Sequence, residues 1–385
     1  MRITPKKNTC CGCHSCELSC PKSAIRLDAD EEGFYYPLID DNKCIDCGIC
    51  EKTCPVINAN RLICTSKLAF AAVDTDMISE RESSSGGMFS VIANHIIDKG
   101  GVVFGAAFDS DLQLKHIPVC TKNDLIRLKG SKYLSSNLSN CYRSVKEYLG
   151  SGRLVCFSGT PCQVAGLKLF LVRDYPNLIT IDLICHGVPS QKMFSSFIED
   201  IQTRRHIKLT GFLFRDKNIN GWACCSPSCF SEKKYIAYDK AMSVYMSLFL
   251  NGELMREMCY SCPFAQNGRV SDFTLGDFWN ILDVYPDFVK GKGVSALILN
   301  TEKALSIFEK IKNKIYFKEC SFQDIASGNY NLNHPTIRPA NRDLFLDRLN
   351  DIPKTINENL PESYRIDKAK YILKRILRKF RLYNK

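Results

Sequence analysis

Residues 10–21 read CCGCHSCELSCP, and residues 44–55 read CIDCGICEKTCP. Both stretches place their cysteines in one spacing, C-x2-C-x2-C-x3-C-P, so eight cysteines form two copies of a repeat. A [4Fe–4S] cube needs four thiolate ligands, and gaps of two residues let one tight turn supply three of them. The proline fixes the chain where it leaves the ligands. Each repeat therefore predicts one [4Fe–4S] cluster.

The same spacing occurs in bacterial two-cluster ferredoxins, in which the fourth cysteine of each run binds the other cluster. One predicted ligand set is Cys10, Cys13, Cys16 and Cys54. The other is Cys44, Cys47, Cys50 and Cys20. Cys11 lies outside the register and is not expected to be a ligand. A zinc site would not use the third cysteine or the proline.

Composition places these clusters in a larger redox protein. A chain of 385 residues has room for a ferredoxin module and a catalytic domain. No apolar stretch of signal-peptide type follows Met1, and no apolar run approaches the roughly 18 residues of a membrane span. With 21 cysteines, the chain is expected to work in the reducing cytoplasm and to bind metal.

The positive charge is concentrated at the C-terminal end of the chain. Of the formal charge of +11, residues 365–385 contribute nine Lys or Arg against one acid, Asp367. No nucleic-acid partner is therefore expected for the main domain. Apolar residues between Tyr371 and Tyr383 recur at helical spacing among these cations. A basic amphipathic helix is typical of peripheral contact with the inner face of a membrane or of a partner-docking element. Packing on its own domain is the alternative.

The predicted fold class is α+β in three parts. Residues 1–60 form a two-cluster ferredoxin module, residues 65–345 a mixed α/β domain, and residues 361–385 the basic helix. Short apolar runs predict strands, namely Ala24–Leu27, Val102–Phe108, Leu154–Ser158, Thr180–Cys185, Leu209–Phe214, Phe273–Asp277 and Val294–Leu299. Helical spacing predicts helices at Met88–Asp98, Gln163–Leu171 and Ala241–Leu250.

Two loops of the α/β region have features of binding sites. Ser83–Gly87 precedes a predicted helix, and small residues there expose backbone N–H groups to a phosphate. A simple capped turn is the alternative. Residues 158–163 read SGTPCQ between a strand and a helix. Cys162 then lies in a first helical turn, where the helix dipole favours a thiolate. It is either a ligand, a cofactor contact or a structural cysteine.

Four scattered thiols are candidates for a third cluster. Cys162 and Cys185 follow successive predicted strands, at the edge where α/β folds place ligands. Cys259 and Cys262 add a C-x-x-C pair. This pair is equally compatible with a redox dithiol. A rival and weaker source of ligands is the group Cys224, Cys225 and Cys229.

Taken together, these segments resemble the beta-subunit family of coenzyme F-420 hydrogenase/dehydrogenase. The matching stretches are Ser84–Gly87, Gly130–Tyr133, Phe157–Gln163, Asp182–Ser190, Phe214–Lys217 with Gly221-Trp222, Cys259–Phe264, and Ser271-Asp272 with Gly276–Trp279. A fused N-terminal two-cluster module also looks like an arrangement common in that family. The resemblance implies that the mixed α/β domain is of flavin type and that the chain is an oxidoreductase. It would pass electrons between [4Fe–4S] clusters and FAD, with a redox protein as donor or acceptor.

The resemblance also implies site residues. Those expected near the flavin or its phosphates are Ser84, Ser85, Gly86, Gly87, Gly159 and Thr160, with Lys132 as a charge partner and Asp216, Lys217 and Asp277 as weaker candidates. The acceptor is not identified; some similar chains are associated with surface-polysaccharide synthesis. The alternative function is an electron-transfer adaptor subunit, which relays electrons to a partner that holds the substrate site.

Overall fold

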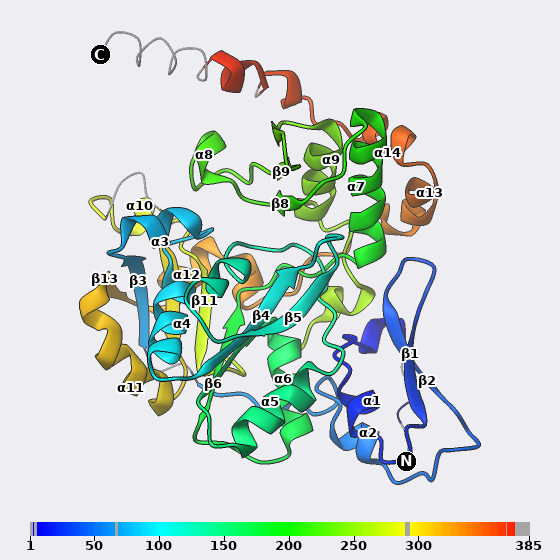
Figure 1. The fold of residues 1–385 in the computed structure, drawn as a ribbon, viewed down its shortest axis with the longest axis vertical. Coiled ribbons are helices and arrows are strands. Elements are labelled where there is room, and N and C mark those ends of the chain that lie inside the picture. Colours follow the sequence, from blue (N-terminus) through cyan, green and yellow to red (C-terminus); the bar gives the residue numbers. More distant parts are fainter. Residues whose placement is uncertain (1–2, 4–5, 66–67, 289–292, 367, 374–385) are drawn as a thin grey trace.

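The computed structural model describes residues 3, 6–65, 68–288, 293–366 and 368–373. Figure 1 shows a small N-terminal module beside a domain built on a large sheet, with a mainly helical cap at one end. The largest sheet has eight strands in mixed orientation, and helices lie along its faces. The predicted α+β class is confirmed.

The ferredoxin module carries its two cysteine runs on matching loops. It contains η1 (Lys7–Thr9), α1 (Ser15–Ser19), α2 (Ile49–Lys52) and η2 (Ala59–Arg61), with an antiparallel hairpin of β1 (Ile25–Ala29) and β2 (Tyr35–Ile39). Left-handed φ angles occur at Gly12 and His14 after Cys10, and at Asp46 and Gly48 after Cys44. The two loops therefore repeat one backbone path, of the kind that turns N–H groups toward Fe–S clusters.

The main sheet brings several strand ends to one edge. Its strand order is β13-β3-β12-β11-β7-β6-β4-β5. The bounds are β3 (Leu68–Asp74), β4 (Val102–Phe108), β5 (Leu114–Val119), β6 (Val155–Gly159), β7 (Leu178–Leu183), β11 (Phe273–Asp277), β12 (Ser295–Leu299) and β13 (Ile315–Cys320). Strands β4, β6, β7 and β11 run parallel, and β5, β12 and β13 pair antiparallel with their neighbours. The loops that follow the parallel strands therefore gather at one edge.

Helices cover both faces of this sheet. One face packs on α4 (Met88–Asp98) and α11 (Glu302–Ile311), whose apolar sides bury Ile92, Ile96 and Phe308. The other face packs on α5 (Cys141–Gly150) and α6 (Pro161–Leu171), and farther along on α10 (Ile281–Val284) and α12 (Phe322–Gly328). α3 (Met77–Glu82) follows β3, and η3 (Asp124–Arg127) follows β5.

The cap has a core of its own. It contains α7 (Gln191–Arg205), α8 (Lys217–Asn220), α9 (Lys240–Leu250), α13 (Phe345–Asn350) and α14 (Ile352–Glu358), with a small sheet of β8 (Gly211–Leu213), β9 (Ser228–Phe230) and β10 (Tyr235–Ala237). The predicted strand at 209–214 is thus shorter than expected and belongs to this second sheet. Four short 3-10 segments complete the domain: η4 (Glu257–Ser261), η5 (Lys312–Lys314), η6 (Tyr330–Leu332) and η7 (Arg342–Leu344).

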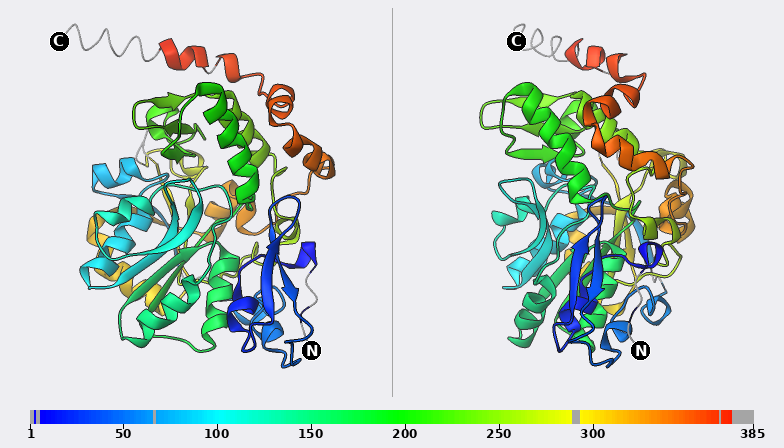
Figure 2. Two further views of the ribbon diagram at one scale, coloured as in Figure 1. Left: turned by 45° about the vertical axis from the view of Figure 1, so that its right-hand side comes forward. Right: turned by 90° about the vertical axis from the view of Figure 1, so that its right-hand side faces the viewer.

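The ferredoxin module is docked against both the sheet domain and the cap. α1 packs beside α6, and the tip of the β1–β2 hairpin reaches α7 (Figure 2). There Lys192 donates to the backbone oxygen of Glu31 at 2.7 Å. The guanidinium of Arg342 forms a buried ion pair with Glu32 and also donates to the Met255 oxygen at 3.0 Å. These contacts fix the module relative to the sheet edge.

The predicted basic helix lies only partly within the described residues. Residues 364–366 and 368–373 are helical, and residues 374–385 lie outside the described part. The Tyr371 ring packs on that of Tyr238 at 5.1 Å, and the Tyr364 hydroxyl donates to the Tyr238 oxygen. This start of the helix therefore contacts the cap. Among the helices in the described ranges, none has the length and apolarity needed to cross a membrane.

Candidate metal centres and cofactor site

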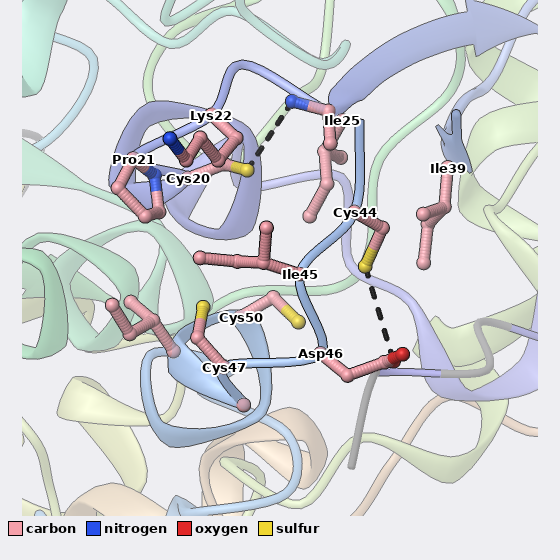
Figure 3. A pocket seen from close by; sticks show the side chains of 13 residues that line it. Cys20, Pro21, Lys22, Ile25, Ile39, Cys44, Ile45, Asp46, Cys47 and Cys50 are labelled. Carbon is pink, nitrogen blue, oxygen red and sulfur yellow. Dashed lines mark hydrogen bonds between the residues drawn. The ribbon is translucent and has the colours of Figure 1, made fainter. Parts of the chain in front are cut away.

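One predicted ligand set lines a pocket at the surface of the ferredoxin module. We call Cys20, Cys44, Cys47 and Cys50 the outer group. All four line a single pocket together with Ile45 and Asp46, as Figure 3 shows. Cys47 is exposed to solvent, whereas Cys50 is buried. The structure therefore brings this predicted set together, including Cys20 from the other run.

The second predicted set faces the interior of the protein. We call Cys10, Cys13, Cys16 and Cys54 the middle group. Burial raises the pKa of the Cys16 thiol, and the nearby sulfurs of Cys10, Cys54 and Cys50 raise it further. Cys13 is buried against α6, where a Cβ on Gly166 would lie 3.1 Å from its Sγ. In both predicted sets, the fourth cysteine from the other run therefore lies near its three partners, and the binding of clusters stays a prediction.

The scattered cysteines of the sheet domain also come together. We call Cys162, Cys185, Cys259 and Cys262 the inner group. Burial raises the pKa of Cys185 well above its ordinary value, and the other three sulfurs add to the effect. Burial likewise raises the pKa of Cys259 to about 12 and that of Cys262 to about 11, with neighbouring sulfurs of the group contributing. The rivals Cys224, Cys225 and Cys229 are not among these neighbours.

The arrangement of these thiols fits a cluster better than a single ion. Among the described residues, no three metal-ligating side chains converge on one point. A [4Fe–4S] cube takes one thiolate at each iron, so its ligands surround a volume instead of meeting at an atom. Thiols that raise one another's pKa need a bound cation to become thiolates together. All three groups therefore suit cubes, with the twelve cysteines named above as proposed ligands.

Cys11 links two of the groups, which the sequence did not reveal. The Cys13 thiol raises the pKa of Cys11 well above the ordinary value, and the Cys11 thiol in turn raises the pKa of Cys162. Cys11 thus lies between the middle and inner groups, although it is not a predicted ligand of either. Its only sequence signal was its place beside Cys10.

The loop before α4 is held close to the sheet. The Gly86 N–H donates to Ser295 Oγ at 2.9 Å, and a Cβ on Gly86 would lie 2.4 Å from the Ala72 oxygen. Ser84 Oγ accepts from the Ser131 N–H at 2.7 Å. Gly87 has φ of 90° and lies against Asp74. Close packing thus accounts for both glycines, and their contact with a cofactor stays a prediction.

Two predicted lysines have their ammonium groups occupied by protein oxygens. Lys217 donates to Glu80 Oε1 at 2.6 Å and to the Ser85 oxygen at 2.7 Å. Lys132 donates to three backbone oxygens at the end of η3, those of residues 127, 128 and 129. Burial lowers the pKa of Lys132 to about 7. Lys132 therefore secures the Gly130–Tyr133 loop, and Lys217 ties the cap to the Ser84–Gly87 loop.

The two predicted acids are similarly engaged. Asp277 accepts from the buried Arg215 guanidinium and, at 2.6 Å, from Trp222 Nε1. Asp216 caps α8 and accepts from Tyr235 at 2.6 Å. Ser85, Lys217 and Asp277 thus gather at the sheet edge, whereas the carboxylate of Asp216 faces the small sheet of the cap.

The turn that carries Cys162 is supported by a buried polar network. Thr160 caps α6 in a capping box with Gln163, and its Oγ1 lies 3.2 Å from Cys162 Sγ. Gln163 also donates to Ser136 Oγ at 2.9 Å, and Ser136 contacts His116 Nδ1 at 2.8 Å. His116 Nε2 lies 2.9 Å from the Ser158 oxygen, so Nε2 carries the proton. The network places Gly159 and Thr160 directly beside the inner group.

Two parts of the chain match known protein families. Residues 9–58, which hold both cysteine runs, match the "4Fe-4S dicluster domain" family. Residues 152–325 match the family of the C-terminal part of the coenzyme F420 hydrogenase/dehydrogenase beta subunit. The resemblance stated from the sequence is thereby confirmed, and the matched stretch contains all four cysteines of the inner group.

One curated relative and one solved structure extend the comparison. The chain is 22% identical over 320 residues to a "Coenzyme F420-dependent sulfite reductase" of Methanocaldococcus jannaschii, covering 80% of this chain and 46% of the relative. It thus spans about half the length of that relative. A chain of the F420-reducing [NiFe] hydrogenase complex from Methanosarcina barkeri matches with a TM-score of 0.48 and 17% identity, covering 77% of this chain and 93% of that one. These names mention F420, and FAD gains no support from them.

Proposed function

We propose that this protein is an oxidoreductase that passes single electrons through three [4Fe–4S] clusters to a flavin, which exchanges them as a hydride with an acceptor such as a deazaflavin. The observation that carries the proposal is the unbroken succession of three cysteine groups from the module surface to the sheet edge. The match of residues 152–325 to the beta-subunit family, together with the dicluster match, supports iron–sulfur electron transfer.

The succession rests on contacts between neighbouring groups. Cys50 of the outer group packs in one apolar cluster with Cys16 and Cys54 of the middle group. Cys13 of the middle group is joined through Cys11 to Cys162 of the inner group. Each group therefore adjoins the next, and the route begins at the exposed Cys47.

The cofactor is proposed to lie at the strand-end edge beside the inner group. A flavin, when bound, supplies exchange between single electrons and a hydride, whereas a deazaflavin carries only the hydride. Thr160 contacts Cys162, and Ser85 and Lys217 line the same edge of the sheet. These residues would orient the cofactor next to the last cluster. The F420 in the name of the relative makes a deazaflavin the candidate hydride acceptor, and the FAD expected from the sequence is the candidate that takes single electrons.

Anaerobic reconstitution tests both parts of this proposal. The chain loaded with iron and sulfide is expected to contain about twelve irons, because three cubes hold four each. Binding of FAD and of F420 is then measured separately by equilibrium dialysis. Retention of one of them near equimolar amount supports the proposal. About eight irons would remove the inner cluster, and retention of neither would remove the cofactor site.

A second candidate function is favoured by the length comparison. The chain covers 46% of the sulfite reductase relative, so the match lies in one part of a longer protein. An adaptor subunit that relays electrons to a separate substrate-reducing partner fits this relation. Such a chain would load three clusters but retain neither FAD nor F420, which separates it from the first candidate.

Membrane contact by the C-terminal segment is a separate proposal. Residues 365–385 carry nine Lys or Arg, and Ile372 and Leu373 are exposed in the described part. Anionic surfaces attract such segments. The full chain is expected to sediment with anionic liposomes, and a chain ending at Pro361 is not. Equal sedimentation would show that the segment does not serve this role.

A further inference from the structure

A buried arginine lies at the junction between the middle and inner groups. Arg256 is only 3% exposed and precedes η4, the segment that carries Cys259. Its Nε donates to the Cys10 oxygen at 2.6 Å, and Nη2 lies 3.7 Å from Cys10 Sγ. The Arg256 guanidinium therefore contacts Cys10 of the middle group, while its backbone lies in the same segment as Cys259 of the inner group.

The surroundings of Arg256 hold its charge in place. Nη2 also donates to the Tyr35 oxygen at 2.6 Å, and the guanidinium lies 4.2 Å from the centre of the Tyr36 ring. A Cβ on Gly12 would lie 2.9 Å from Nη1, so only glycine leaves room there. The side chain thus has a single position between the module and the sheet domain.

This cation has no carboxylate partner within the described residues. The titratable groups that face it include the sulfurs of Cys10, Cys11, Cys162 and Cys259 and the hydroxyl of Tyr36. An unpaired buried charge costs several kcal/mol. Thiolates that hold clusters would supply the missing negative charge on both sides. Arg256 is therefore suited to a state in which the middle and inner groups are loaded.

We propose that Arg256 is a positioning residue that raises the reduction potentials of the middle and inner clusters above that of the outer cluster. The inference rests on the proposed function. A buried cation favours the reduced cluster, which carries one more negative charge, and net charge and hydrogen bonds to the sulfurs set cluster potentials. One electron leaves the outer cluster, which is oxidised, and enters the middle cluster, which is reduced, with no bond made or broken. Arg256 makes this inward step favourable.

The outer group provides an internal comparison. Among the residues that line its pocket, the cation is Lys22, which is exposed. Water screens an exposed charge far more than a buried one. Removal of Lys22 is therefore expected to change the outer potential much less than removal of Arg256 changes the other two.

The test is a redox titration followed by EPR on the reconstituted full chain. In Arg256→Met, the middle and inner clusters are expected to become at least tenfold harder to reduce, about 59 mV for a one-electron step. The outer cluster should keep its potential. Lys22→Met, the matched control, should leave the middle and inner potentials unchanged.

Arg256→Lys separates charge from bonding geometry. Lysine keeps the charge, but its single ammonium group lacks the planar set of N–H donors with which arginine reaches the Cys10 and Tyr35 oxygens together. If charge sets the potentials, this variant should stay within about threefold of the wild type even if Arg256→Met does not load clusters. Unchanged potentials in Arg256→Met, equal shifts of all three clusters, or a tenfold shift in Arg256→Lys would overturn the inference. Absence of an inner-cluster signal from the wild type would instead refute the proposed third cluster, while the middle and outer clusters still test Arg256.

Discussion

Gly166 of α6 lies so close to Cys13 that a Cβ placed on it would be 3.1 Å from Cys13 Sγ and 3.0 Å from Cys13 Cβ. The helix that begins beside the inner group thus forms, five residues after Pro161, the wall of the middle group. This contact joins the ferredoxin module to the sheet domain where electrons are proposed to cross.

Gly166→Ala should therefore disturb the module. The new methyl would also lie 2.9 Å from Tyr142 Oη, so it would clash with buried side chains on both sides. We expect a loss of about 1–3 kcal/mol of stability, as in other overpacked cores, together with weaker loading of the middle cluster. Thermal unfolding and iron content, both measured anaerobically, check this. Gly150→Ala is the matched control because open space surrounds that position at the end of α5. Equal behaviour of the two variants would contradict the packing argument.

Cys185→Ser should remove the inner cluster alone. Cys185 lies among the other three sulfurs of the inner group and away from the module runs. The variant is expected to hold about eight irons in place of about twelve, since each cube holds four. Cys120→Ser, at an exposed cysteine outside the groups, should keep the wild-type content. A Cys185→Ser protein with unchanged iron would show that the inner group holds no cluster.

Much of this site was predictable because cysteine spacing is a local signal. Gaps of two residues encode the turn that wraps a cube, so both module ligand sets followed from residues 10–21 and 44–55. Cys162 and Cys185 followed from their places after two strands, since parallel strands end at one edge. Arg256 was not predictable: it lies 246 positions from Cys10, and no local pattern marks a contact between such distant segments. The same holds for the pair of Arg342 and Glu32, 310 positions apart.

The charged cofactor candidates show a different limit of the sequence. Lys132, Lys217, Asp216 and Asp277 matched family segments, and each has protein partners in the structure. A motif identifies residues that matter to a site but does not separate a contact with the cofactor from support of a loop. That distinction needs the hydrogen-bond partners.

The Arg342–Glu32 pair should contribute to docking of the hairpin. Arg342 is buried and Glu32 is mostly so. Glu32→Gln removes the charge from one side, and we expect a loss of roughly 1–3 kcal/mol, seen as a lower melting temperature of the anaerobic protein. Asp111→Asn breaks the exposed pair with Lys208 and should cost less than about 1 kcal/mol. If Asp111→Asn lowered the stability as much as Glu32→Gln, the proposed role of the Arg342–Glu32 pair in docking would be wrong.

His116 should make stability depend on pH. Burial lowers its pKa to about 4, against roughly 6.5 in an unfolded chain. Between these values the unfolded state binds the extra proton, so stability falls as the pH drops from about 6.5 to 4, by roughly 3 kcal/mol from this group. His116→Gln should flatten this part of the dependence of the melting temperature on pH. His206→Asn, at an exposed histidine, should not. An unchanged slope in His116→Gln would refute the assignment.

The central claim is that electrons reach a two-electron cofactor through the inner group. Its most direct test is anaerobic mixing of the dithionite-reduced, desalted chain with F420 and, separately, with FAD, followed by absorbance of each cofactor. The account predicts that the wild type reduces one of them and that Cys185→Ser, with its module clusters still reduced, does so at least tenfold more slowly. Equal rates in the two proteins, or no reduction of either cofactor by the wild type, would contradict it.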